Sequence, residues 1–266
     1  GARAFCAGGD LKPVFEAQVS HNLLFLRDLF SHEYVFNYLL QTFPKPYISF
    51  LFGYTMGGGM GASMNGSHRI VCDSCILAMP ETSIGFFPDV GAGYFLNRCP
   101  GEIGLYLGLT GLSVNASEAL YAGLATHYVD YSSYEDIQRA ILIQAPSTHE
   151  EVDNILSDFS KAPTTVSLLE SHRKEIDAYF GQKTLANIFS ALKESSTPFA
   201  QETLKTLNRR CPMSLHATFK QLRRAKGMHP YDVMRMEYRM SQHFVRMSDF
   251  KEGIRSAVIE KDRTPR

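Results

Sequence analysis

The glycine-rich segment at residues 52–61, Phe-Gly-Tyr-Thr-Met-Gly-Gly-Gly-Met-Gly, constrains the fold of this chain more than any other stretch. It follows a short apolar run at residues 47–51, bounded by Pro46 and Gly53, which is typical of a buried strand. The residues from Met60 onward have the pattern of a helix start. Three consecutive glycines therefore stand at a predicted strand-to-helix junction.

A junction of this kind can hold an anion. The first turn of a helix has backbone N–H groups without partners inside the helix, and the helix dipole places positive charge there. Glycine leaves a ligand free to approach and can adopt a positive φ, although small residues also let a helix and a sheet pack closely. A second glycine turn, Ala7-Gly8-Gly9, precedes another predicted helix. Two such turns could present N–H groups to one oxygen, as in an oxyanion hole.

Composition indicates a globular protein rather than a nucleic-acid binder or a membrane protein. The 266 residues suffice for one large domain or two ordinary ones. The 27 basic and 27 acidic side chains give a formal net charge of zero, whereas nucleic-acid-binding chains usually carry a basic surplus. No apolar stretch approaches the roughly 20 residues of a membrane span, so we expect no membrane partner. Five cysteines suit a reducing compartment, and Cys72 and Cys75 lack the further ligands of a zinc site, so no metal is expected.

The order of predicted elements divides the chain near residue 130. Apolar residues at helical spacing predict one or two helices between residues 13 and 43. Beyond Asp130 strand-like runs vanish and amphipathic helical patterns continue to the end. We therefore expect a mixed α/β region at residues 1–130 and an all-helical region at residues 131–266. The other predicted strands lie at residues 69–72, 75–79 and 125–129, and the other predicted helices of the first region at 94–98, 103–109 and 116–122.

Two acidic residues in the turn-rich loop at residues 80–91 are candidate reactive groups. Glu81 follows an apolar strand pattern and is followed by Ile84, Phe86 and Phe87. A carboxylate in such surroundings is desolvated, which raises its pKa and its reactivity. Asp89 lies eight residues later. Each has a structural alternative, since Glu81 could cap a helix or turn and Asp89 could be the N-cap of the next helix.

These features together resemble the crotonase superfamily of enoyl-CoA hydratases and isomerases over almost the whole chain. In that superfamily an Ala-Phe-x-Ala-Gly-x-Asp segment and a later Gly-Gly-Gly segment supply two N–H groups that polarise an acyl-CoA thioester carbonyl. By position these donors are Gly9 and Gly58. The resemblance implies a spiral of β-β-α repeats that forms two nearly perpendicular sheets, with a C-terminal helical region and with the first strands of the fold missing from this chain. The matching motifs are residues 4–10, 55–61, 79–91, 109–111, 123–127, 236–239 and 252–257.

The resemblance also implies roles for single residues. Glu81 would be the catalytic carboxylate, which either attacks the thioester to form a mixed anhydride or activates water as a general base. Asp89 would bind a 3-hydroxyl group of the substrate and assist Glu81. Gly61 stands where enoyl-CoA hydratases have a second catalytic Glu, and a glycine there would leave space for water, which favours hydrolysis over hydration. Asp10 and Arg3 complete the predicted substrate-binding set. Arg3 flanks the first glycine turn and could either pair with the phosphates of CoA or be a solvated charge.

The activity that the resemblance implies is hydrolysis of a 3-hydroxyacyl-CoA thioester, with 3-hydroxyisobutyryl-CoA of valine breakdown as the substrate. Coenzyme A is then part of the substrate, and no separate cofactor is expected. Two alternatives stay open: a hydratase or isomerase, and a structural component of the mitochondrial ribosomal small subunit, where similar proteins occur. Homo-oligomer formation also stays open. The resemblance implies the mitochondrial matrix in a eukaryote and the cytoplasm otherwise.

Overall fold

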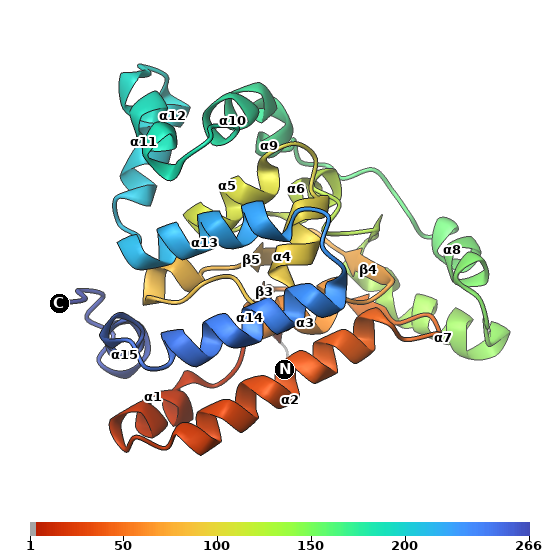
Figure 1. Ribbon diagram of the computed structural model, residues 1–266. Coiled ribbons are helices and arrows are strands. Elements are labelled where there is room, and N and C mark those ends of the chain that lie inside the picture. The colour runs from red at the N-terminus through yellow and green to blue at the C-terminus, as the bar shows by residue number, and fades with distance from the viewer. Residues whose placement is uncertain (1–3) are drawn as a thin grey trace.

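Two three-stranded parallel sheets form the centre of the fold in the computed structural model, which describes residues 4–266 (Figure 1). One sheet has the order β1-β3-β5 and the other the order β2-β4-β6. Consecutive strands therefore alternate between the sheets, and the chain advances as the predicted spiral. The strands are β1 (Ala4–Cys6), β2 (Ile48–Phe50), β3 (Tyr54–Met56), β4 (His68–Val71), β5 (Ile76–Ala78) and β6 (His127–Tyr128).

The parallel arrangement brings three loops to one edge of the β1-β3-β5 sheet. In the pairing of β3 with β5, Tyr54 lies opposite Ile76 and Met56 lies opposite Ala78. β1 pairs with β3 on the other side, and Cys6 lies opposite Thr55. Because all three strands run the same way, the segments that follow them emerge together. These segments are the two glycine turns and the loop that contains Glu81 and Asp89.

The N-terminal helices cover this edge. The predicted helical region between residues 13 and 43 is two helices, α1 (Leu11–Val19) and α2 (Leu23–Gln41). The break has a local cause, because the Asn22 side chain accepts a hydrogen bond from the Phe25 N–H at 3.1 Å and so caps the start of α2.

The sequence did not reveal β3, which is a three-residue strand inside the glycine-rich segment and leads directly into α3 (Gly58–Met64).

The remaining elements are helical apart from β6. As predicted, residues 131–266 contain helices and no strand. Between β5 and β6 lie η1 (Glu81–Ile84), α4 (Ala92–Phe95), η2 (Leu96–Arg98), α5 (Ile103–Thr110) and α6 (Ala116–Tyr121). After β6 come η3 (Tyr131–Ser133), α7 (Tyr134–Gln144), α8 (His149–Ser157), α9 (Leu168–Ser171), α10 (Arg173–Phe180), α11 (Leu185–Glu194), α12 (Pro198–Leu207), α13 (Pro212–Ala225), α14 (Pro230–Phe244), α15 (Ser248–Ile254) and η4 (Arg255–Ile259).

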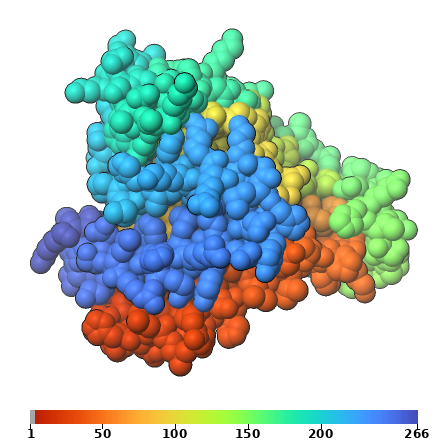
Figure 2. Space-filling model, in the orientation of Figure 1, coloured from red at the N-terminus to blue at the C-terminus, as the bar shows by residue number. Residues whose placement is uncertain are grey.

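The C-terminal helices return to the N-terminal ones. α14 packs along α2 and α15 packs against α1 and η1, so the blue end of the chain lies on the red end (Figures 1 and 2). The Phe86 ring stacks on the Phe250 ring with centroids 4.4 Å apart. One continuous core thus joins the two parts, and the division at residue 130 stays a prediction. None of the helices within residues 4–266 is long and apolar enough to cross a membrane.

Candidate active site

A cavity of about 1420 Å³ opens at the edge where the three loops meet. Its wall includes both glycine turns, the loop after β5, the inner face of α2 and the C-terminal helices. Leu29, Phe30 and Ile84 give part of this wall an apolar surface. The cavity is therefore built from segments that are far apart in the sequence, and it is large enough for a substrate of the size of an acyl-CoA thioester.

The two glycine turns converge at one end of the cavity. A Cβ atom built on Gly58 would lie 3.5 Å from the Gly9 nitrogen, which shows how closely the turns approach. Gly8 and Gly57 have φ angles of 100° and 52°, a region that side chains disfavour, and glycine is therefore required there. Within residues 4–266 the N–H groups of Gly9 and Gly58 donate no hydrogen bond. The geometry supports the predicted oxyanion hole.

Glu81 lies beside this pair of turns. It is the first residue of η1, its side chain is 7% exposed, and it makes no capping hydrogen bond, so the cap interpretation is wrong. One carboxylate oxygen, Oε2, is buried without a hydrogen-bond partner among the described residues, and the other, Oε1, would be 3.1 Å from a Cβ on Gly57. Burial and the charge of Glu33 raise the pKa of Glu81 to about 8. A carboxylate held in this way is reactive once it is ionised.

Asp89 faces the same cavity and is bonded to a tyrosine. The Tyr34 hydroxyl donates a hydrogen bond of 2.6 Å to Oδ2 of Asp89. The helix that follows, α4, has Gly91 as its N-cap and no side-chain cap, so the N-cap interpretation of Asp89 is also wrong. Burial, together with the charges of Glu33 and Glu81, raises the pKa of Asp89 well above its usual range.

Glu33 is a site residue that the sequence analysis did not identify. Its Oε1 atom would lie only 2.9 Å from a Cβ on Gly58, so the carboxylate reaches the glycine turns from α2. Burial raises the pKa of Glu33. A weak signal was present, because Glu33 follows the buried residues Leu26 and Phe30 of the same helix by seven and three positions, which places it beside their face. Nothing in the local sequence indicated that this face borders a reactive site.

Of the predicted substrate-binding residues Asp10 and Arg3, the structure describes only Asp10. Asp10 lines the cavity, and its side chain also caps α1 by accepting the Lys12 N–H at 3.0 Å. Arg3 lies outside the described residues. Two cations that the sequence analysis did not select, Arg209 and Arg210, line the cavity between α12 and α13.

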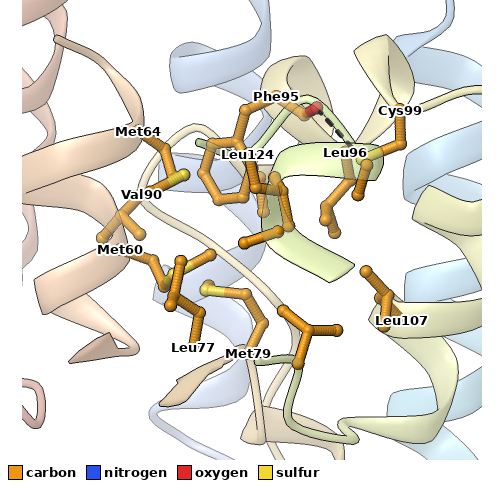
Figure 3. Packing of buried hydrophobic residues seen from close by; sticks show 14 of the residues in the cluster. Met60, Met64, Leu77, Met79, Val90, Phe95, Leu96, Cys99, Leu107 and Leu124 are labelled. Carbon is orange, nitrogen blue, oxygen red and sulfur yellow. Dashed lines mark hydrogen bonds between the residues drawn. The ribbon is translucent and has the colours of Figure 1, made fainter. Parts of the chain in front are cut away.

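Gly61 does not leave open space, contrary to the expectation. It is buried in α3 and does not line the cavity. A Cβ at this position would lie 2.6 Å from Cβ of Val90 and 2.9 Å from Oδ1 of Asn37. Figure 3 shows Val90 among the buried methionine and leucine side chains of the core. The absent side chain at Gly61 therefore makes room for Val90, and the argument that it admits water is not supported by this arrangement.

Comparison with known proteins places this chain in one family. Residues 1–266 match the enoyl-CoA hydratase/isomerase family, and the chain belongs to it. Among its relatives, 3-hydroxyisobutyryl-CoA hydrolase, mitochondrial, is 38% identical in Bos taurus and 37% identical in Homo sapiens. Each of these alignments covers 100% of this chain and 70% of the relative.

Solved structures show the same fold. A crystal structure of an enoyl-CoA hydratase from Rhodobacter sphaeroides is 37% identical, with a TM-score of 0.89 over 99% of this chain and 75% of that chain. A carnitinyl-CoA dehydratase from Mycobacterium thermoresistibile is 34% identical, with a TM-score of 0.90 over 99% and 76% of the two chains. The predicted crotonase-type fold is thus confirmed, while the angle between the sheets stays a prediction.

The carboxylate cluster predicts a measurable effect of Glu33 on Glu81. If Glu81 reacts as a carboxylate, kcat/KM for thioester hydrolysis should rise with pH up to about 8, its pKa. Glu33→Gln removes a negative charge that raises this pKa, so the rising limb should move to lower pH. The measurement is the pH profile of kcat/KM, with Glu16→Gln on α1 as an exposed control that should leave the profile unchanged. A limb that stays in place in Glu33→Gln would contradict the coupling.

Proposed function

We propose that this protein hydrolyses the thioester of a 3-hydroxyacyl-CoA, with 3-hydroxyisobutyryl-CoA as the substrate. The observation that carries the proposal is Glu81, a desolvated carboxylate beside two converging glycine turns, with one oxygen that has no hydrogen-bond partner within residues 4–266. The names of the mitochondrial relatives support the same reaction. No relative named here is a ribosomal component, and the ribosomal alternative gains no support.

The geometry indicates how the reaction would proceed. The thioester carbonyl oxygen would accept the N–H groups of Gly9 and Gly58, which stabilise the negative charge that develops on it. In one route Glu81 attacks the carbonyl carbon, the C–S bond breaks, CoA leaves as a thiolate, and water then cleaves the mixed anhydride. In the other route Glu81 takes a proton from water, which attacks the carbonyl carbon directly. Both routes need Glu81 in its ionised form.

Asp89 and Tyr34 suit recognition of a hydroxylated acyl group. The Tyr34 hydroxyl donates to Oδ2 of Asp89. No hydrogen bond among the described residues involves the other oxygen, Oδ1, which is therefore available to a substrate hydroxyl. A buried polar group that is built to bind a hydroxyl is left unpaired by an analogue without one, which disfavours that analogue. Arg209 and Arg210, which also line the cavity, could pair with the phosphates of CoA.

A hydratase remains the second candidate, and a specific observation favours it. Hydration of a double bond needs two carboxylates, and the structure brings Glu33 into the cavity together with Glu81. The solved structures named above also carry hydratase and dehydratase titles. The decisive test is crotonyl-CoA. We expect no hydration above the background rate, and hydration at a rate comparable to thioester hydrolysis would overturn the proposal.

Asp89→Ala should narrow the preference for the hydroxylated substrate. The ratio of kcat/KM for 3-hydroxyisobutyryl-CoA to that for isobutyryl-CoA should fall by about tenfold or more, because the variant cannot bind the substrate hydroxyl. Both substrates are measured on the wild type and the variant under the same conditions. An unchanged ratio would mean that Asp89 does not contact the hydroxyl group.

The cellular setting follows from the same proposal. We infer the mitochondrial matrix if the source is a eukaryote, because the relatives named above from Bos taurus and Homo sapiens are mitochondrial, and the cytoplasm otherwise. Assembly into a homo-oligomer and the absence of a separate cofactor or metal stay predictions.

A further inference from the structure

The turn that carries Asp89 is strained. Val90, the next residue, has a φ of 52°, which is a rare conformation for a β-branched side chain, and Gly91 has a φ of 94°. Val90 is 1% exposed, so its side chain is fixed in the core. Strained residues persist only where the surrounding structure holds them, and they cluster at functional sites. The groups that hold this turn are therefore candidates for a role at the site.

Three side chains from outside the turn bind its backbone. Oε2 of Glu237 accepts the N–H of Gly91 at 2.7 Å, and its Oε1 accepts the N–H of Gly93 at 2.8 Å. Nε2 of Gln221 donates to the carbonyl of Pro88 at 2.7 Å and to Oε1 of Glu237 at 2.9 Å. On the opposite side, Nδ2 of Asn65 donates to the carbonyl of Val90 at 3.0 Å. Both sides of Asp89 are thus tied.

Glu237 is the centre of this arrangement. It lies on α14, is 0% exposed and does not line the cavity, so it cannot touch the substrate. Burial raises its pKa to about 7, which shows that its position is electrostatically unfavourable. The three hydrogen bonds it accepts offset part of this cost. An apolar side chain in its place would leave two buried N–H groups without partners.

The carboxylate of Asp89 is held as well, by a helix that contacts α14. Tyr34, which donates to the Asp89 carboxylate, lies on α2, and α2 packs against α14. The rings of Tyr34 and Tyr238, one residue after Glu237, meet edge to face with centroids 6.5 Å apart. The backbone of the turn and the carboxylate of Asp89 are therefore held by two helices in contact.

We propose that Glu237 is a positioning residue, which sets the direction of the Asp89 carboxylate through the strained turn and thereby the selectivity for a hydroxylated acyl group. The inference rests on the proposed function, because selectivity is defined by the hydroxyl that Asp89 binds. It assigns no chemistry to Glu237. Glu237 fixes the position of Asp89, at a site where a misplacement of about 1 Å can cost on the order of 10²-fold in rate.

The test is Glu237→Gln, which keeps the shape of the side chain but replaces one acceptor oxygen with an NH₂ group that cannot accept an N–H. The ratio of kcat/KM for 3-hydroxyisobutyryl-CoA to isobutyryl-CoA should fall by about tenfold. A purely structural loss would reduce the active fraction and lower both values equally. The matched control is Glu118→Gln, another buried glutamate whose carboxylate accepts a backbone N–H, from Asn115 at 2.9 Å in α6. This control should leave the ratio unchanged, and a Glu237→Gln ratio equal to that of the wild type would overturn the inference.

A double-mutant cycle separates the inference from the proposed function. If Glu237 acts through Asp89, Glu237→Gln should change the ratio in the wild type but not in Asp89→Ala. If Asp89→Ala itself leaves the ratio unchanged, the proposed role of Asp89 fails. If only Asp89→Ala changes the ratio, the inference fails and the proposed function stands. Should Glu237→Gln not fold, Gln221→Met decides, because it removes the bond to Pro88 and should lower the ratio in the same direction.

Discussion

Glu81→Gln should lower kcat for thioester hydrolysis by several orders of magnitude while binding of the acyl-CoA survives. The substitution removes the charge that attacks or accepts a proton and nearly keeps the shape of the side chain. Binding should survive because the cavity is lined by many other groups, among them both glycine turns and Arg209. The measurements are single-turnover rates and the Kd of a non-hydrolysable CoA thioether. Near-normal turnover would refute the assignment of Glu81.

The same variant should be more stable than the wild type at neutral pH. Glu81 has a pKa of about 8 when folded, above its unfolded value of about 4.5, so the folded state binds the proton more tightly. Between pH 4.5 and about 8 the unfolded chain releases this proton while the folded protein keeps it. The stability of the wild type therefore falls as the pH rises through this interval. Removing the carboxylate should raise the free energy of unfolding at pH 7 by roughly 2 kcal/mol. This is less than the full effect of the shifted pKa, since the Gln amide also has to be desolvated. Urea unfolding at pH 5 and pH 7 tests this, and a gain that does not grow with pH would contradict it.

Gly59→Ala should have the second-largest effect on activity. A Cβ at this position would lie 2.2 Å from the carbonyl oxygen of Cys6, which is backbone and cannot move alone. β1 and α3 would have to separate, and the amides of Gly9 and Gly58 would move apart with them. Loss of one donor from an oxyanion hole costs about 10²- to 10³-fold in kcat, and we expect a loss of that size.

The control for this prediction is Gly123→Ala. Gly123 has a φ of 73°, so alanine is strained there by roughly 1 kcal/mol, but apart from its two neighbours in the chain no other described residue has a heavy atom within 4 Å of the added Cβ. Its kcat should equal that of the wild type once it is folded. Circular dichroism shows whether each variant is folded at the assay temperature, and kcat is compared per folded molecule. A Gly59→Ala enzyme that is folded and fully active would show that the spacing of the two turns does not control the rate.

The sequence revealed the parts of the site that are encoded locally. The two glycine turns and the Glu81 loop could be recognised directly, because each has a characteristic sequence of its own and follows a strand of the same parallel sheet. Glu33 and Tyr34 could not be recognised, because they lie on a helix whose inner face meets the site only after folding. The support of the Asp89 turn by Glu237 was hidden for the same reason, since Glu237 binds the N–H groups of Gly91 and Gly93, which lie 146 and 144 positions before it in the sequence.

Gly61 shows where a local interpretation failed. The absence of a side chain was correctly recognised as informative, but its consequence depends on Val90, which enters the core from a distant turn. The strand β3 was missed for a related reason, because its three residues lie within the glycine-rich segment and are specified by their neighbours in the sheet rather than by an apolar pattern of their own.

The contact between Gly61 and Val90 limits how this site could change during evolution. A glutamate at position 61 cannot arise alone, because even its first side-chain carbon would overlap with Val90. The overlapping atom is Cβ of Val90, which alanine would also have, so the turn itself would have to move first, and this movement would displace Asp89. The intermediate would lose the original selectivity before it gained a new carboxylate. A glutamate at position 61 therefore requires an earlier rearrangement of the turn that holds Asp89, and the two changes have to occur in that order.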